Sequence, residues 1–331
     1  MFGLPGNVYD APAIDLAHRR QYLITGAEST DSVLCVWSAD LDHPGPWKLM
    51  ETREPQPRLN PFQLYTLRFS AMDSKRGRLI LSLMDENRTR ILSLDSMTWT
   101  EVEPDLSYPY VRDGVETAID PVEDRLYLFG GDVRFKEFPI PAGPPAPFLL
   151  PGLARSTLAP PYDPSNGRPQ GLHDPAFSYD ARRRQFWVHG GQRYQRFAPN
   201  GELVEVDELW RFDLDTGRWT LLVNGTSAPS ARYLHHMMVD SLNDRLLLWR
   251  GTSFNGRSQV ALEDWWQLPL PADGTATWQR FLPANAIPRA MDVSVFDPVR
   301  RVFSFAGGSG PARGGRFELN IDGTPVWTTV V

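Results

Sequence analysis

The sequence predicts an all-β fold, a β-propeller of six sheets with four antiparallel strands each. Three observations support this prediction. A motif of apolar strand, aspartate, polar turn and second apolar strand occurs six times along the 331 residues. A second turn that leads to a tryptophan follows most of these motifs. The chain is 41% hydrophobic, which is enough to form a large core and excludes a disordered chain.

The six motifs share an aspartate in the turn between two β-rich segments. Two examples are AIDPVEDRLYLFGG and MVDSLNDRLLLWRG, and glycine often ends the second segment. An aspartate at the start of a turn accepts hydrogen bonds from the turn's own N–H groups, so each motif is predicted to be a β-hairpin. The aspartates are Asp15, Asp73, Asp120, Asp180, Asp240 and Asp297.

The second hairpin of most units ends in a tryptophan. Its turns read LDSMTW at 94–99 and LDTGRW at 214–219, and both are typical of hairpin turns. We expect each tryptophan to pack between adjacent sheets, where it buries roughly 150–250 Å². These residues are Trp47, Trp99, Trp219, Trp278 and Trp327. Two hairpins per unit predict a single six-bladed domain over 1–331, with blades at about 8–52, 62–104, 113–155, 173–224, 233–284 and 290–331.

The third unit departs from this pattern. It has no matching tryptophan, and ten prolines lie between Pro139 and Pro169. Proline cannot donate a hydrogen bond to a strand ladder, so the outer half of this unit is not expected to be an ordinary hairpin throughout. Two interpretations of the Pro-rich segment 132–172 stay open: an ordered flap or docking surface, and a disordered insertion.

The repeat resembles that of the kelch family. The resemblance lies in Arg-Leu-Tyr-Leu-Phe-Gly-Gly at 125–131, in Arg-Tyr-Leu-His at 232–235, and in Trp219 and Trp278 at the ends of their units. It extends over essentially the whole chain and implies a six-bladed propeller, but no particular function. We expect the first and last units to join by side-chain packing, because Pro5 disfavours an exchanged N-terminal strand.

In such a propeller, the loops that enter the first strand of each unit and leave the second reach one rim of a central channel. Arg112, Arg232 and Arg289 each stand eight residues before a turn aspartate. Arginine binds carboxylates and phosphates bidentately, although an arginine at this position can equally tie neighbouring loops together. The candidate ligand-binding residues on the rim are Tyr65, Arg68, Arg112, Arg193, Tyr194, Arg232, His235, Asn255, Arg289 and Asp292.

Several kinds of chemistry find no support in the sequence. Lys and Arg total 34 against 40 Asp and Glu, so the basic surface of a duplex nucleic-acid binder is not expected. Cys35 is the one cysteine, and the six histidines form no HExxH motif, so no metal site is predicted. The glycine-rich run 307–315 lacks the pattern of a phosphate-binding loop. We expect no cofactor and identify no catalytic residue.

The function most favoured by these patterns is a non-catalytic binding platform. Its rim and Pro-rich segment would recognise a protein segment or an acidic ligand. The alternative is a small-molecule enzyme, such as an isomerase, mutarotase or cyclase, that acts on an anionic metabolite at the same rim. We expect neither a nucleic-acid nor a membrane partner, and a monomer or a part of a larger assembly. A cytoplasmic protein is expected, because the sequence has no signal-peptide pattern and no 18-residue apolar run.

Overall fold

The computed structural model describes most of the strands and the tighter turns of the chain. The described residues are 11–26, 34–43, 45–53, 67–83, 89–102, 113–120, 122, 125–132, 146–148, 169, 172–194, 203–223, 229–271, 277–285, 293–307 and 315–330. The chain divides into two compact units. Unit 1 comprises 1–104 and 283–331, and unit 2 comprises 105–282.

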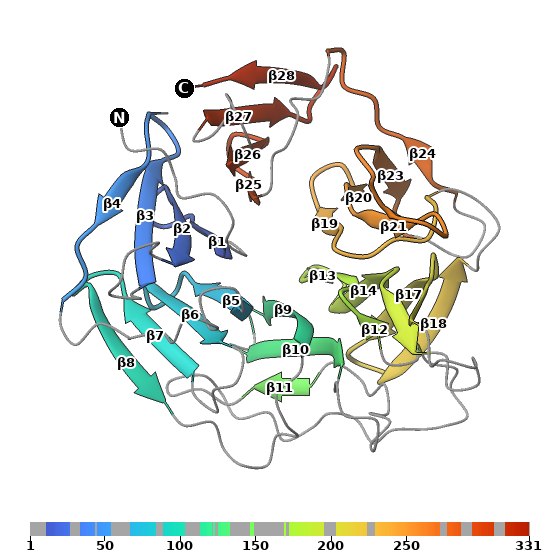
Figure 1. Ribbon diagram of the computed structural model, residues 1–331, viewed down its shortest axis with the longest axis horizontal. Coiled ribbons are helices and arrows are strands. Elements are labelled where there is room, and N and C mark those ends of the chain that lie inside the picture. The colour runs from blue at the N-terminus through green and yellow to red at the C-terminus, as the bar shows by residue number, and fades with distance from the viewer. Residues whose placement is uncertain are drawn as a thin grey trace. The chain divides into compact units, whose positions relative to one another are not determined.

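Unit 1 contains three sheets of four antiparallel strands (Figure 1). The first sheet is β1 (Ala11–Asp15), β2 (Arg20–Gly26), β3 (Leu34–Asp40) and β4 (Lys48–Met50). The second is β5 (Leu67–Asp73), β6 (Arg78–Leu83), β7 (Thr89–Ser93) and β8 (Thr98–Val102). The third is β25 (Val293–Asp297), β26 (Val302–Gly307), β27 (Gly315–Asn320) and β28 (Val326–Thr329). Strand β1 contacts both β5 and β25, so the first sheet lies between the other two.

Unit 2 contains two further four-stranded sheets. One has the order β13 (Ala176–Asp180), β14 (Gln185–His189), β17 (Leu209–Asp213) and β18 (Arg218–Val223). The other has the order β19 (His236–Asp240), β20 (Arg245–Trp249), β23 (Trp265–Pro269) and β24 (Gln279–Arg280). Strand β13 contacts β19 on one side and β9 of a smaller sheet on the other.

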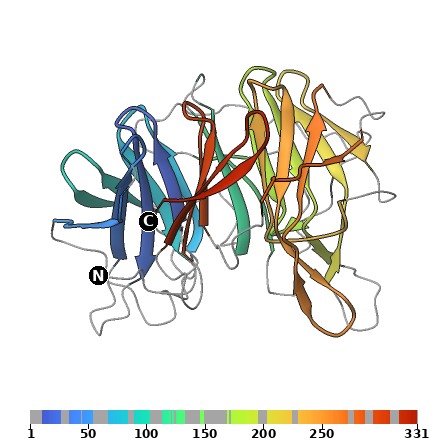
Figure 2. The ribbon, with the colours of Figure 1, turned by 90° about the horizontal axis from the view of Figure 1, so that it is seen from above.

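The remaining sheets of unit 2 are smaller. A three-stranded sheet consists of β9 (Asp113–Asp120), β10 (Arg125–Asp132) and β11 (Ala146–Phe148). Another consists of β12 (Leu172–His173), β15 (Gln192–Tyr194) and β16 (Leu203–Glu205). The two-stranded sheet is β21 (Thr252–Phe254) and β22 (Gln259–Ala261). In Figure 2 this orange hairpin extends beyond the larger sheets of its unit.

The fold class is therefore all-β, with antiparallel sheets of the β-propeller type and no helix among the described residues. Five sheets have the four strands that the sequence predicts. At the third repeat the described residues form the three strands β9, β10 and β11. Most of the Pro-rich segment 132–172, where a fourth strand and a flap or insertion were predicted, lies outside the described residues.

The turn aspartates behave as predicted. All six are buried. Asp15 Oδ1 accepts hydrogen bonds from the amides of Ala17 (3.0 Å) and His18 (3.2 Å). Asp297 Oδ1 does the same for the amides of Val299 (2.9 Å) and Arg300 (3.3 Å). Each carboxylate thus satisfies donors that the tight turn would otherwise bury without a partner.

The fourth residue after these aspartates adopts a left-handed backbone conformation in five of the repeats. The φ values lie between 53° and 60°. Four of the five are not glycines, although only glycine adopts this conformation without steric cost. These residues are Arg19, Gly77, Arg184, Asp244 and Arg301. The charged side chains here are held by ion pairs, which compensate for the strain of the turn.

Three of the predicted tryptophans lie in cores between adjacent sheets. Trp99 of β8 packs with residues of the first two sheets of unit 1. Trp219 of β18 contacts Phe129 of β10, with ring centroids 5.5 Å apart. Trp278 lies in the core between the two four-stranded sheets of unit 2. The prediction that the outer tryptophans fill the space between sheets is confirmed at these positions.

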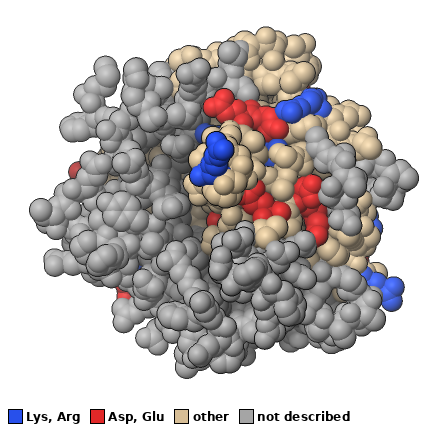
Figure 3. Space-filling view, turned by 45° about the vertical axis from the view of Figure 1, so that its right-hand side comes forward, with Lys and Arg blue, Asp and Glu red and all other residues tan. Residues whose placement is uncertain are grey.

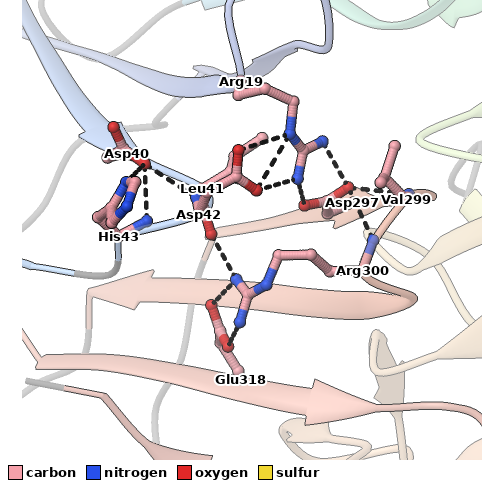
Figure 4. A network of polar contacts seen from close by, with 9 residues as sticks. All are labelled: Arg19, Asp40, Leu41, Asp42, His43, Asp297, Val299, Arg300 and Glu318. Carbon is pink, nitrogen blue, oxygen red and sulfur yellow. Dashed lines mark hydrogen bonds and ion pairs between the residues drawn. The ribbon is translucent and has the colours of Figure 1, made fainter.

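The first and last sheets of the chain meet inside unit 1 through side chains, as expected (Figure 4). Arg19 donates to both carboxylate oxygens of Asp297, at 3.0 and 2.6 Å, and also pairs with Asp42 at 2.7 Å. Arg300 donates to the carbonyl oxygen of Leu41 at 2.6 Å and pairs with Glu318 at 2.8 Å. Burial alone would raise the pKa of Asp297, but Arg19 and two turn amides lower it below its ordinary value.

Candidate functional site

The strongest candidate site is one edge of unit 2, where loops of the two four-stranded sheets meet. We call it the unit 2 rim and define it as residues 172–175, 189–194, 203–208, 230–236 and 250–264. Strands β12, β15, β16, β21 and β22 belong to it. The rim is built on the ends of buried strands, and rigid scaffolds of this kind commonly carry binding loops.

Glycines allow the loop 230–236 to approach its neighbours closely. Gly190 and Gly251 have φ values of +64° and +110°. A Cβ atom on Gly190 would lie 2.7 Å from the carbonyl oxygen of Arg232, and one on Gly251 would lie 2.7 Å from Cβ of His235. The amide of Gly191 donates to the Arg232 carbonyl at 2.8 Å. A side chain at Gly190 would therefore push the loop 230–236 away from the neighbouring sheet, and one at Gly251 would push it away from the end of β20 in its own sheet.

Arg232 is buried and fully engaged with the protein itself. Its Nη1 and Nη2 donate to Asp264 Oδ1 (2.7 Å) and Oδ2 (3.1 Å). Nη1 also donates to the carbonyl of Arg250 at 2.9 Å, and Nε donates to the carbonyl of Ser230 at 3.0 Å. Burial alone would raise the pKa of Asp264, but Arg232 and Trp266 lower it below its ordinary value. This guanidinium ties loops together and presents no free fork to a ligand.

His235 is also buried, against His189 of β14. His189 Nδ1 and His235 Nε2 are 2.9 Å apart, and the two rings meet edge to face. Burial lowers the pKa of His189 to about 3 and that of His235 well below its ordinary value, and the charge of Arg232 acts in the same direction. Both imidazoles are therefore neutral at pH 7. The pair is a buried contact between the sheet of β14 and the sheet of β19, and it is not exposed to a ligand.

His236 lies on the other side of the strand, as the adjacency of the two histidines predicts. Its ring stacks on Trp249 with centroids 5.4 Å apart. Burial, and then the charge of Arg250, lowers the pKa of His236 to about 4. Unit 2 thus holds three neutral histidines close to its rim.

The other sequence-predicted site residues divide into three groups. Asn255 is exposed and accepts hydrogen bonds from the amides of Arg257 and Ser258, both at 3.0 Å, so it shapes the turn of the β21–β22 hairpin. Arg68 belongs to β5 of unit 1, and Arg193 and Tyr194 belong to β15, with side chains outside the described part of the structure. Residues outside the described ranges altogether are Tyr65, Arg112, Arg289 and Asp292. Among the described side chains, only those of Arg232 and His235 are brought together.

Sequence reasoning missed Glu205, which fastens the β21–β22 hairpin to the rim. Its Oε2 accepts a hydrogen bond from Ser253 Oγ at 2.9 Å, and its Oε1 accepts one from the Phe254 amide at 2.8 Å. Nothing in the local sequence marks this glutamate. The hairpin itself has a signal, since the polar, glycine-containing run Asn-Gly-Arg-Ser at 255–258 is typical of a turn.

Leu234 is the second residue that sequence reasoning did not single out. Its φ is +52°, a conformation that is costly for a leucine, and half of its surface is exposed. Its amide donates to the carbonyl of Asp174 at 3.2 Å. An apolar side chain is therefore held in a strained, exposed position by buried neighbours on both sides, Tyr233 and His235.

Asp174, whose carbonyl accepts the Leu234 amide, also interacts with a second carboxyl group, that of Glu116. Asp174 Oδ2 lies 2.9 Å from His173 Nδ1. Burial, with a smaller contribution from the charge of Asp174, raises the pKa of Glu116 on β9 to about 8. Glu116 is therefore protonated for most of the time at pH 7 and can donate a proton, whereas a nearby carboxylate can accept one.

Four further observations concern metal binding, membrane crossing, surface charge and family. The described residues contain no group of three or more His, Cys, Asp or Glu side chains that could hold a metal ion. Within the same ranges, no helix is long and apolar enough to cross a membrane. The described part of the face in Figure 3 carries several acidic side chains and a few scattered basic ones. No protein-family model matches the sequence.

Proposed function

We propose that the chain is a divergent six-bladed propeller of kelch type. The five four-stranded sheets and the β9–β10–β11 sheet at the third repeat support this assignment. The contact between Gly190-Gly191 and the Arg232 loop supports it further, because it gives a physical reason for the Arg-Tyr-Leu-His motif at 232–235, which carries part of the resemblance. A cytoplasmic location is part of the same proposal.

We further propose that the unit 2 rim is a non-catalytic binding platform for a protein segment. The observation that carries this is the strained and exposed Leu234, since a side chain that costs stability in two ways is retained most simply for contact with a partner. Phe254, which is 55% exposed, would supply a second apolar contact on the same rim. Glu205 and the Arg232–Asp264 pair fix the loops beforehand, so binding loses little conformational entropy.

The charges of the rim favour one class of segment. Asp174 and Glu205 carry carboxylates there, whereas the positive charge of Arg232 is neutralised by Asp264. A segment with an apolar anchor and a neighbouring basic residue therefore fits the described rim better than an acidic one. An acidic ligand would depend on Arg112 and Arg289, which lie outside the described residues.

A displayed library of random peptides tests this proposal. Peptides are selected on the intact protein and then measured against Leu234→Asn, because asparagine tolerates the left-handed backbone and removes the apolar side chain. We expect binders that contain apolar and basic residues and lose at least about tenfold in affinity for the variant, roughly the loss of one good apolar contact. The matched control is Leu242→Asn, at an exposed leucine in a distant turn. Equal affinity for the wild type and Leu234→Asn would contradict the proposal.

One observation favours an enzyme as the second candidate. Glu116 is a proton donor at pH 7 near the carboxylate of Asp174, which is the acid–base pair that an isomerase or mutarotase requires. Glu116→Gln keeps a neutral hydrogen-bond donor but cannot release a proton. In a screen of sugar acids for anomerisation or epimerisation by NMR, this second candidate requires turnover by the wild type and at least about a 100-fold loss in the variant.

A further inference from the structure

Among the described residues, β22 pairs with β21 and with no other strand. The Thr252 amide donates to the Tyr233 carbonyl at 2.8 Å, and the Thr252 carbonyl accepts from the Tyr233 amide at 3.0 Å. The backbone groups of Thr252 therefore point away from β22. Thr252 lies opposite Ala261 in the hairpin. Phe254 lies opposite Gln259, and its amide likewise points away from β22, toward Glu205. In an antiparallel pair, residues opposite such positions also point outward. The N–H and C=O groups of Gln259 and Ala261 therefore form a free edge.

This edge is short, but it lacks two other features that prevent strands from pairing, charged side chains and proline. Gln259, Val260 and Ala261 are all exposed, and none of them is charged or a proline. Val260 is an apolar side chain at the centre of the edge and is 40% exposed. The related hairpin β15–β16 is built in the same way, because β12 pairs with β15 as Tyr233 pairs with Thr252 of β21, and β16 is the edge strand among the described residues.

The same edge is complementary to itself. If two copies meet antiparallel with Val260 opposite Val260, Gln259 of each copy lies opposite Ala261 of the other. All outward N–H and C=O groups are then paired, and the two valines face each other in the close, non-hydrogen-bonded position. A two-fold axis through Val260 satisfies both copies at once, as an isologous interface requires.

The charges that flank the edge match in this register. Counting outward from Val260, Arg257 of one copy falls beside Glu263 of the other, and the two-fold axis repeats the pair. Both residues are exposed, and neither forms an ion pair with a described residue of its own chain. A shift of the register by two residues would separate these charges, so they favour the symmetric arrangement.

We propose that two copies of this chain associate through antiparallel pairing of their β22 strands, which extends the β21–β22 sheet across both molecules. The paired edge is three residues long, so the dimer is weak and reversible. The interface is separate from the buried Arg232 network. Its test does not depend on whether the rim binds a peptide through Leu234.

Sedimentation of the full-length protein over a range of concentrations tests the proposal. We expect a monomer–dimer equilibrium with a dissociation constant below about 1 mM, which corresponds to about 4 kcal/mol. Val260→Lys places two positive charges at the two-fold axis and should leave only monomer. Val326→Lys is the matched control, because Val326 is 41% exposed on the edge strand β28, and it should dimerise like the wild type. Thermal melting establishes that both variants are folded.

Charge reversal identifies the partner as a second copy. Arg257→Glu and Glu263→Arg should each weaken the dimer about tenfold, because each places like charges together twice. The double variant restores opposite charges across the axis and should recover wild-type dimerisation. Recovery is not expected if the edge binds a different protein. A wild type that stays monomeric throughout the range, or a dimer insensitive to Val260→Lys, would overturn the proposal.

Discussion

In unit 1, the sheets β25–β28 and β1–β4 come from opposite ends of the chain and meet through arginine side chains that are partly exposed at the turns. In unit 2, the sheets that begin with β13 and β19 are neighbours in sequence and share a similar ion pair at their turns, between Arg183 and Asp244. They meet in addition through a buried histidine pair, the loop of the buried Arg232 and close glycine contacts. Among the described residues, both units thus have an ionic junction at the turns, and unit 2 adds a buried one.

The largest expected loss of stability comes from removing the buried charge of Arg232. Arg232→Ala leaves the carboxylate of Asp264 without its main partner in a mostly buried place and should lower the free energy of unfolding by about 3–5 kcal/mol. Urea unfolding monitored by tryptophan fluorescence measures this loss. Arg280→Ala removes the half-exposed second partner of Asp264 and is the control, with an expected loss below about 1 kcal/mol. Similar losses in both variants would show that the Arg232 contact is not specially important.

A pair of glycines with nearly equal φ values isolates the effect of close packing. Gly190→Ala (φ +64°) should lower the free energy of unfolding by about 3 kcal/mol or more. The new methyl group would clash with the Arg232 carbonyl, and the left-handed backbone would add strain. Gly323→Ala (φ +65°) has open space around it and should cost about 1–2 kcal/mol from strain alone. Thermal unfolding of both variants measures the difference, and equal costs would contradict the close approach seen at Gly190.

The buried histidines predict that acid weakens unit 2. Their folded pKa values lie below the ordinary 6.5, so the unfolded chain binds more protons once the pH falls below about 6.5. Stability is complete above that pH and declines below it, by up to about 1.4 kcal/mol per pH unit for each histidine. For His236 the decline ends near pH 4. His236→Phe keeps the stacking on Trp249 and should reduce the slope of unfolding free energy between pH 6.5 and about 4. An unchanged slope would contradict the assignment of a half-buried, neutral His236.

The smallest effect concerns the junction between the chain ends. Arg19→Asn introduces a residue that tolerates the left-handed backbone and removes the ion pair to Asp297. The Asp297 carboxylate still accepts hydrogen bonds from two turn amides. We expect a loss of about 1 kcal/mol, because the two turn amides still satisfy the buried carboxylate, and a smaller loss in high salt because Arg19 is partly exposed. Unfolding at low and high ionic strength measures both. A loss as large as that of Arg232→Ala would remove the distinction between the two junctions.

The sequence was sufficient to predict the repeated parts of the fold. The buried turn aspartates, the tryptophans between sheets and most of the four-stranded sheets follow from local rules of turn chemistry and alternation. The third repeat was predicted to be irregular from its prolines, and most of its Pro-rich segment lies outside the described residues. The small β12–β15–β16 sheet was missed, because strands of two or three residues give no periodic signal.

The site was less predictable, because its contacts join residues far apart in the sequence. Arg232 was a candidate for ligand binding, yet its partner Asp264 lies 32 residues later and has no motif of its own. His235 has its partner 46 residues earlier. The strain at Leu234 also could not be anticipated, since leucine at a left-handed position contradicts its ordinary preference. Such departures from local rules are where functional positions are most often found.

The residue four places after each turn aspartate has a consequence for how the repeats can be rearranged. Arg19 and Arg184 each reach back to the turn aspartate of an adjacent sheet, whereas Asp244 instead receives Arg183. The sheets are consequently not interchangeable modules. A gene in which the repeat containing Asp244 had exchanged places with the repeat containing Arg19 would set carboxylate against carboxylate at the turns. The charges at this position therefore record the order in which the repeats must follow one another.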